Sequence, residues 1–172
     1  MVKSTLRQND DDRVNESGSD DGLDASICVI DHAQRRLTFA GANLPLLFTQ
    51  HGQIKEICGD RHSLGYRSSK SDFIFTNHVV PFEAGQAFYM VTDGVTDQIG
   101  GPTGRLFGRR RLMAALEDGL ALPMQGQMDR ILDILTAYRG HEARRDDQTF
   151  FGFVPLTAAP RDEEKQTPKS FK

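Results

Sequence analysis

The sequence lacks the features expected of a nucleic-acid-binding, membrane-spanning or disulfide-stabilised protein. Its 172 residues carry 21 Lys and Arg against 24 Asp and Glu, a formal net charge of -3, which argues against nucleic acid as the main partner. No apolar stretch approaches the roughly 20 residues of a membrane helix, so we expect no membrane contact. The two cysteines, Cys28 and Cys58, lie far apart in the sequence and are expected to be reduced residues in or near the core, which favours a cytoplasmic protein.

Several catalytic and metal-binding patterns are absent as well. The sequence has no closely spaced cysteine pair and no His-x-x-x-His pattern of the kind that favours zinc. It also has no Gly-x-Ser-x-Gly elbow of a serine hydrolase. The glycine-rich stretch 100–105 lacks the Gly-Lys-Ser/Thr ending of a P-loop. We interpret this stretch as a flexible connection from which Arg105, or Arg109 beyond it, could contact a phosphoprotein substrate.

The strongest positive signal is an apolar run that leads into Asp-Gly. Phe88–Val91 has the length and composition of a buried strand, and Asp93 and Gly94 follow closely. A carboxylate at the end of such a strand must be paired, hydrated or bound to a cation, because a bare buried charge is very costly. Gly94 leaves space beside Asp93 for a hydrated ion or a phosphate. The alternative is an ordinary Asp-Gly turn.

A second acidic pair precedes another apolar strand. Asp146 and Asp147 lead through Gln-Thr into the run 150–154. If this strand lies antiparallel and adjacent to the strand before Asp93, then Asp93 and Asp146 meet at the same edge of the sheet. Carboxylate oxygens gathered in this way suit Mg²⁺ or Mn²⁺ better than zinc. The sequence therefore predicts a site for a hard divalent cation.

Together, these elements resemble the SpoIIE-like branch of the PP2C serine/threonine phosphatases. The resemblance extends from about residue 21 to residue 154. It is carried by the segments 22–31, 36–47, 82–97 with its Thr-Asp-Gly-Val-Thr-Asp, and 146–149 with its Asp-Asp-Gln-Thr. The fold class that it implies is α+β, a PP2C-like α-β-β-α sandwich of antiparallel sheets flanked by helices. Residues 23–154 would form the C-terminal portion of such a domain.

The resemblance also implies roles for individual residues. Asp93, with Gly94, and Asp146 correspond to metal-binding positions for two or more Mn²⁺ or Mg²⁺ ions. Asp147 would be a further metal residue or a neighbour that supports one. Asn43 would position a phosphate, although a structural Asx turn before a proline is the alternative.

The activity implied is hydrolysis of phosphoserine or phosphothreonine by activated water, without a phosphoenzyme. The implied substrate is a small regulatory protein of the STAS, anti-sigma-antagonist type. A different class of function stays open, that of a non-catalytic or degenerate domain that binds a partner through exposed strands. A homodimer or strand exchange between copies is part of that alternative.

One family motif has no counterpart here. Relatives carry an Asp in a strand followed by Gly-His-Gly, and its carboxylate bridges two metals; the sequence contains no Gly-His-Gly. We therefore expect a domain incomplete at its N-terminal side, weakly active or inactive alone. Residues 1–22 are expected to hold a helix end and a mobile acidic loop. A longer parent protein could be anchored at a membrane through an upstream sensor region.

Local patterns predict the remaining elements. Two strands, 26–31 and 36–40, are expected to form a hairpin, followed by short strands at 46–49 and 54–58. The segment 73–80 alternates only partly between apolar and polar residues. Apolar spacing of three and four residues predicts helices over 109–117 and 124–138. Residues 155–172 are expected to form a disordered tail.

Overall fold

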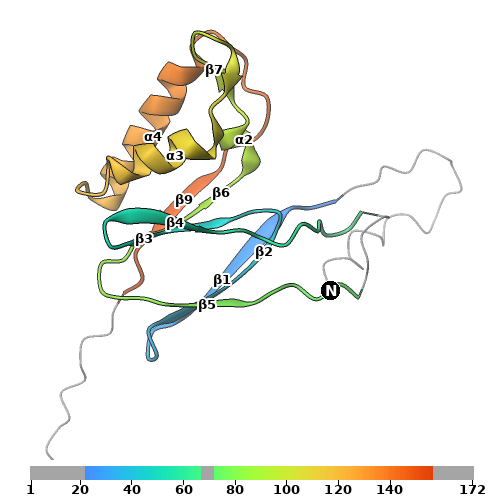
Figure 1. The fold of residues 1–172 in the computed structure, drawn as a ribbon, viewed down its shortest axis with the longest axis vertical. Helices are drawn as coiled ribbons and strands as arrows, with labels where there is room; N and C mark the ends of the chain where they lie inside the picture. Colours follow the sequence, from blue (N-terminus) through green and yellow to red (C-terminus); the bar gives the residue numbers. More distant parts are fainter. Residues whose placement is uncertain (1–21, 67–71, 157–172) are drawn as a thin grey trace, which may run out of the picture.

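The computed structural model describes residues 22–66 and 72–156, which form two antiparallel sheets with helices packed on one of them (Figure 1). The helix end and acidic loop expected for 1–22 lie outside the described residues, apart from Gly22. The expected tail likewise lies outside them beyond Leu156. Among the described residues, no helix combines the length and apolar character needed to cross a membrane.

The three-stranded sheet has the order β1-β2-β5. The predicted hairpin is confirmed: β1 (Ala25–Asp31) pairs with β2 (Arg36–Ala42), and Asp31 Oδ1 accepts a hydrogen bond from Gln34 N in the turn. The third strand, β5 (His78–Pro81), pairs with the other edge of β2.

The segment before β5 explains the partial alternation seen in the sequence. Its residues 73–77 are not a strand, and they contact the segment around residues 60–62 instead of a sheet. Phe73 stacks on His62 with ring centroids 4.1 Å apart, and the Thr76 backbone N donates to Asp60 Oδ2 at 2.7 Å. Only the last part of the predicted segment therefore joins the sheet.

The four-stranded sheet has the order β4-β3-β6-β9. Its strands are β4 (Gln53–Ile57), β3 (Leu46–Gln50), β6 (Phe88–Val91) and β9 (Phe150–Phe153). All neighbours are antiparallel, as the short turns between strands predicted. Because β6 has partners on both sides and buries nearly every side chain, it is the central strand of the domain.

Two helices pack on the outer face of the four-stranded sheet (Figure 1). They are α3 (Gly108–Glu117) and α4 (Met124–Arg139), which confirm the two predicted helices to within one residue at each end. Leu112 and Leu116 of α3 and Ile131 of α4 are buried in the core between the helices and this sheet. The predicted apolar stripe is therefore a packing surface.

The connection between β6 and α3 differs from the flexible segment expected from its glycines. After a short helix, α2 (Asp93–Thr96), the chain forms a hairpin of β7 (Ile99–Gly100) and β8 (Arg105–Leu106). Tyr138 fixes this hairpin, since its carbonyl accepts from Gly101 N at 2.7 Å and its hydroxyl donates to Arg105 O at 2.9 Å. Glycine there permits close packing against α4.

A second core lies between the two sheets. It joins Leu37 and Phe39 of β2 to Leu46 and Phe88 of the four-stranded sheet. The described residues therefore form three layers: helices, four-stranded sheet and three-stranded sheet. On the outer face of the three-stranded sheet, an apolar row of Ile27, Val29 and Val79 is exposed.

The cysteines are both free, as expected. Cys28 is half-buried on β1, where its Sγ lies 3.8 Å from Met90 Sδ, and this burial raises the pKa of the thiol to about 11. Cys58 is exposed just after β4, so the expectation that it lies in or near the core is wrong.

Candidate metal-binding site

The pairing of β6 with β9 brings the two acidic segments to one edge of the sheet. The ladder ends with Val91 opposite Phe150. Beyond it, Thr92 N donates to Thr149 O at 3.1 Å, and Thr149 N donates to Thr92 Oγ1 at 2.9 Å. Asp93 follows Thr92 directly, and Asp146 lies three residues before Thr149, so both leave the sheet on the same side.

Close packing at Gly94 shows how near the two segments come. A Cβ at Gly94 would lie 2.4 Å from Asp147 O and 3.3 Å from Asp146 Cβ. Thr92 Oγ1 also donates to Asp147 O at 3.1 Å. The side chains of Asp93, Asp146 and Asp147 are all exposed beside this contact. The absence of a side chain at Gly94 is thus a steric requirement of the site.

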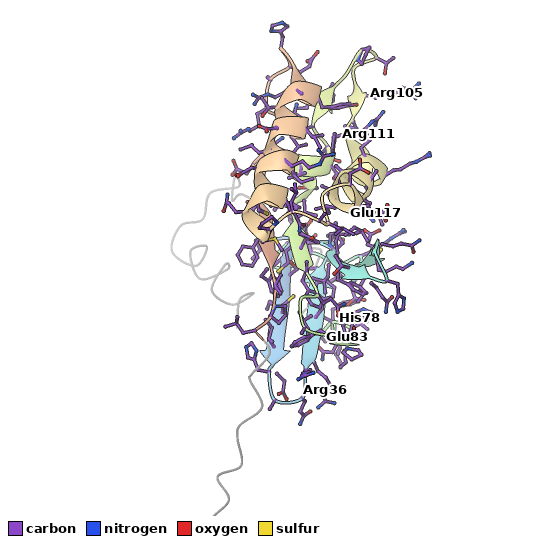
Figure 2. All side chains as sticks on the ribbon, turned by 90° about the vertical axis from the view of Figure 1, so that its left-hand side faces the viewer. Arg36, His78, Glu83, Arg105, Arg111 and Glu117 are labelled. Carbon is purple, nitrogen blue, oxygen red and sulfur yellow. The ribbon has the colours of Figure 1, made fainter. Side chains whose placement is uncertain are left out.

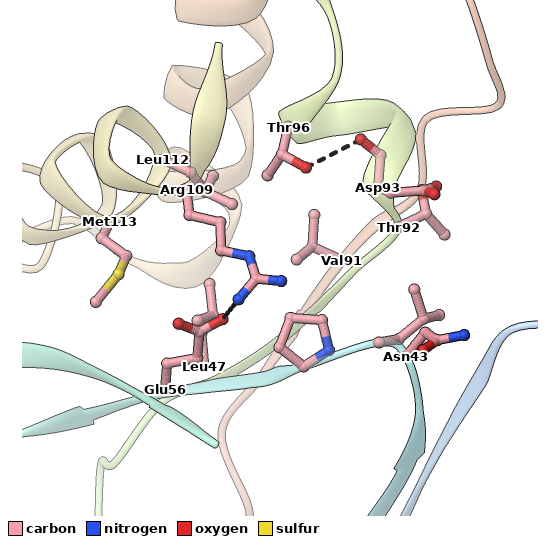
Figure 3. A pocket seen from close by; sticks show the side chains of 12 residues that line it. Asn43, Leu47, Glu56, Val91, Thr92, Asp93, Thr96, Arg109, Leu112 and Met113 are labelled. Carbon is pink, nitrogen blue, oxygen red and sulfur yellow. Dashed lines mark hydrogen bonds and ion pairs between the residues drawn. The ribbon is translucent and has the colours of Figure 1, made fainter. Parts of the chain in front are cut away.

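Asp93 begins a helix, where the sequence alone predicted only a turn or strand end. Thr96 Oγ1 donates to Asp93 O at 3.0 Å, and Asp97 N donates to the same oxygen at 2.7 Å (Figure 3). A carboxylate in the first turn of a helix is favoured by the helix dipole, although four residues give only a small dipole. The Asp93 carboxylate is therefore held at the surface by its own backbone.

Two glutamines that were not predicted as site residues, Gln98 and Gln148, join the two acidic segments through hydrogen bonds. Gln98, only 1% exposed, accepts at Oε1 from Gln148 Nε2 at 2.8 Å, and the same nitrogen donates to Gly94 O at 3.1 Å. Gln98 Nε2 in turn donates to Ala143 O at 3.2 Å. Because Gln98 follows Asp97 and Gln148 lies between Asp147 and Thr149, no apolar run in the sequence marks either glutamine as buried. The Gly94 carbonyl already accepts this hydrogen bond from Gln148. The metal-ligand role predicted for Gly94 stays a prediction.

A cavity of about 50 Å³ opens beside Asp93. Figure 3 shows it between the start of α3, the end of β6 and the β2–β3 turn. Six of the twelve residues that line it are apolar and six are polar or charged. The lining residues are Asn43, Leu44, Pro45, Leu47, Glu56, Val91, Thr92, Asp93, Thr96, Arg109, Leu112 and Met113.

Asn43 reaches this cavity and also fixes its own turn. Its φ of 61° is left-handed, a conformation that asparagine tolerates better than most residues. The Nδ2 donates to Asp24 Oδ1 at 2.9 Å and to Ser63 Oγ at 2.8 Å. These bonds hold the turn through the amide group and are not an Asx turn, which would need a backbone N–H two residues on, where Pro45 has none. The phosphate-positioning role of Asn43 stays a prediction.

Arg105 lies apart from these residues. It is exposed on β8, does not line the cavity, and lies at the end of the molecule opposite Arg36 (Figure 2). Arg109, in the first turn of α3, does line the cavity. The structure thus brings Asn43 and Arg109 to Asp93 but leaves Arg105 outside.

The donor chemistry of the edge fits Mg²⁺ or Mn²⁺, because the available side chains are carboxylates and no imidazole or thiolate accompanies them. The space next to Gly94 is filled by the Asp147 backbone, so the room for an ion that the glycine was expected to leave beside Asp93 is not found there. Within 22–66 and 72–156, moreover, no group of three or more His, Cys, Asp or Glu side chains is gathered around one point. The described residues therefore supply part of a donor set.

Comparison with known proteins agrees with this geometry. The family described as Stage II sporulation protein E (SpoIIE) matches residues 4–153. The chain belongs to the SpoIIE family. Comparison with curated protein sequences gave no significant match.

Solved structures confirm the PP2C-type fold. The SiaA-PP2C domain of Pseudomonas aeruginosa is 34% identical with a TM-score of 0.71, and the match covers 78% of this chain and 52% of that one. The Mn-presoaked SpoIIE phosphatase domain from Bacillus subtilis is 15% identical with a TM-score of 0.57, covering 81% and 59%. The catalytic domain of the serine/threonine phosphatase PstP, in complex with two manganese ions, is 12% identical with a TM-score of 0.53, covering 77% and 59%. The chain thus spans little more than half of these SpoIIE-type and PP2C structures.

Substitution of Gly94 by alanine tests the close approach. We expect the new methyl group to collide with Asp147 O and to lower the free energy of unfolding by about 1–3 kcal/mol. Gly126→Ala in α4 is the matched control, because a Cβ there meets nothing nearer than 3.4 Å and should stabilise the helix by about 0.5–1 kcal/mol. Urea denaturation of both variants measures the difference. Equal stability of Gly94→Ala and the wild type would contradict the packing described here.

The Gln98–Gln148 contact is tested by a double-mutant cycle. If the two amides hold the acidic segments together, Gln98→Ala and Gln148→Ala should be coupled by about 0.5–3 kcal/mol in unfolding free energy. Gln86→Ala, at the other end of β6, should combine with Gln148→Ala additively to within about 0.5 kcal/mol. Additivity of the first pair would show that the amide contact carries no stability.

Proposed function

We propose that this chain provides the Asp93–Asp146 edge of a metal-dependent protein serine/threonine phosphatase. The observation that carries the proposal is the packing of Gly94 against Asp146 and Asp147, which joins two acidic segments more than 50 residues apart in sequence. Membership of the SpoIIE family and the PP2C-type fold support it.

Each residue of the edge has a distinct task in this proposal. Asp93 and Asp146 hold divalent cations, and Asp147 either adds an oxygen or supports Asp146, whose Oδ1 accepts from Asp147 N at 2.7 Å. The cations, when bound, supply charge neutralisation and an activated water for attack on phosphorus. Thr92 and Gln148 fix the backbone from which the acids extend.

The proposed substrate is a phosphoserine or phosphothreonine on a small STAS-type regulatory protein in the cytoplasm. The substrate class follows from the resemblance to the SpoIIE-like phosphatases. Since the described residues supply only part of a donor set, we expect weak cation binding and slow turnover by residues 1–172 alone.

Hydrolysis of p-nitrophenyl phosphate tests the proposal. We expect a slow, Mn²⁺- or Mg²⁺-dependent rate that EDTA abolishes and that falls at least tenfold in Asp93→Asn or Asp146→Asn, because each change removes an anionic ligand. Asp133→Asn, an exposed change on α4, is the matched control and should keep the rate. Hydrolysis that survives both ligand substitutions, or that EDTA leaves unchanged, contradicts the proposal.

A second candidate, a partner-binding module, is favoured by one observation. Ile27, Val29 and Val79 expose apolar side chains on one face of the three-stranded sheet, and Val29 and Val79 lie in register on either side of Thr38. Contiguous exposed apolar surface is typical of interaction sites. Self-association through this face would give the homodimer or strand exchange considered above.

Light scattering at several protein concentrations tests the second candidate. If copies associate through this face, the weight-average mass should rise with concentration, and Val29→Lys should keep the protein monomeric because it places a charge in the apolar row. Lys55→Glu, an exposed change on β4, serves as the control. A constant monomer mass at all concentrations contradicts self-association.

A further inference from the structure

The cavity beside Asp93 has a charged side chain at its rim that the metal edge does not use. Arg109 extends from the first turn of α3 over the cavity, and its Nη1 lies 2.8 Å from Glu56 Oε1 of β4 (Figure 3). The Arg109 side chain is 54% exposed, whereas that of Glu56 is 19% exposed. The arginine is therefore the more solvent-exposed member of the pair.

Most of the hydrogen-bonding capacity of Arg109 is unused. A guanidinium has five N–H donors. Among the described residues, its recorded contacts are Glu56 and a weak one to Cys58 Sγ at 3.9 Å, both through Nη1. The other two nitrogens can therefore bind an anion while the pair is intact or after it opens.

The ion pair is not needed to attach α3 to the sheet. At the other end of the helix, Glu117 Oε1 accepts from Ile54 N of the same strand at 3.0 Å. Leu112 and Leu116 are buried beneath the helix between these two points. An exposed ion pair adds only about 0–1 kcal/mol to such packing. Stability alone therefore does not explain the position of Arg109 at the rim of the cavity.

The dimensions and walls of the cavity fit a small anion. A volume of about 50 Å³ has room for a few water molecules, which is the size range of a small anionic group such as a phosphoryl group. Leu47, Val91 and Leu112 form apolar walls, which exclude water and strengthen a charge interaction inside. Arginine binds phosphate through two parallel N–H···O bonds that lysine cannot reproduce.

We propose that Arg109 recognises the phosphoryl group of a phosphorylated peptide at this cavity, and that Glu56 holds the arginine in place until the peptide arrives. The phosphate dianion competes with the single charge of Glu56 for the guanidinium. The inference rests on the proposed function, because Asp93 on the opposite wall would present the cations to the same phosphate.

Fluorescence anisotropy tests this role. It measures the binding of a fluorescein-labelled heptapeptide with a central phosphoserine, and of the unphosphorylated form of that peptide, to residues 1–172 in EDTA. Arg109→Ala should weaken the phosphopeptide about tenfold, the scale of a lost hydrogen bond to a charged group, without changing the unphosphorylated peptide. Arg109→Lys should restore part of the loss, and Glu56→Gln should tighten phosphopeptide binding a few-fold. Arg110→Ala is the matched control and should stay within twofold of the wild type.

Three outcomes would overturn the inference. They are no preference of the wild type for the phosphopeptide, equal phosphopeptide affinity in Arg109→Ala and wild type, and equal weakening of both peptides by Arg109→Ala. Melting temperatures of all variants separate a folding defect from a binding defect. Peptide binding is measured without metal, whereas the hydrolysis test with Asp93→Asn and Asp146→Asn depends on metal. A negative result in either experiment therefore leaves the other interpretable.

Discussion

The antiparallel pairing of β6 with β9 is the constraint on which the rest of the site depends. Phe88 and Tyr89 of β6 are fully buried on opposite faces of the sheet, one in each core. A slip of one residue would exchange these faces and disrupt both cores at once, so the register is strongly determined. The positions of Asp93 and Asp146 follow from that register. Packing far from the acids, rather than any attraction between them, brings the acids together.

Holding like charges close together requires groups that add no charge of their own. The contacts at this edge meet that requirement: Thr92 N donates to Thr149 O, Thr149 N donates to Thr92 Oγ1, and Gln98 and Gln148 join the two loops through neutral amides. A buried arginine or lysine would neutralise the carboxylates and compete with a cation for them. Because the carboxylates are exposed, their mutual repulsion is screened by water until a cation binds.

The sequence predicted the parts of this arrangement that depend on local patterns. Alternation gave the β1–β2 hairpin, and the spacing of Ile131 and Leu135 gave α4. The meeting of the acidic segments was also predictable, since two apolar strands flanked by acids needed only to be neighbours. Contacts between distant residues were not predictable: Arg109 and Glu56 are 53 positions apart, and the partial alternation of 73–80 gave no sign that Phe73 stacks on His62.

The two sides of the cavity differ in rigidity, and this difference bears on how a metal-dependent hydrolase can work. Asp93 follows a strand between two cores, so the backbone of the acidic side is fixed before any ligand binds. Arg109 is half-exposed and held by an ion pair that contributes little to stability. A phosphate bound between them would therefore meet a preorganised acidic edge and an adaptable cation. Such an arrangement lets specificity change through Arg109 and Glu56 without disturbing the geometry that catalysis needs.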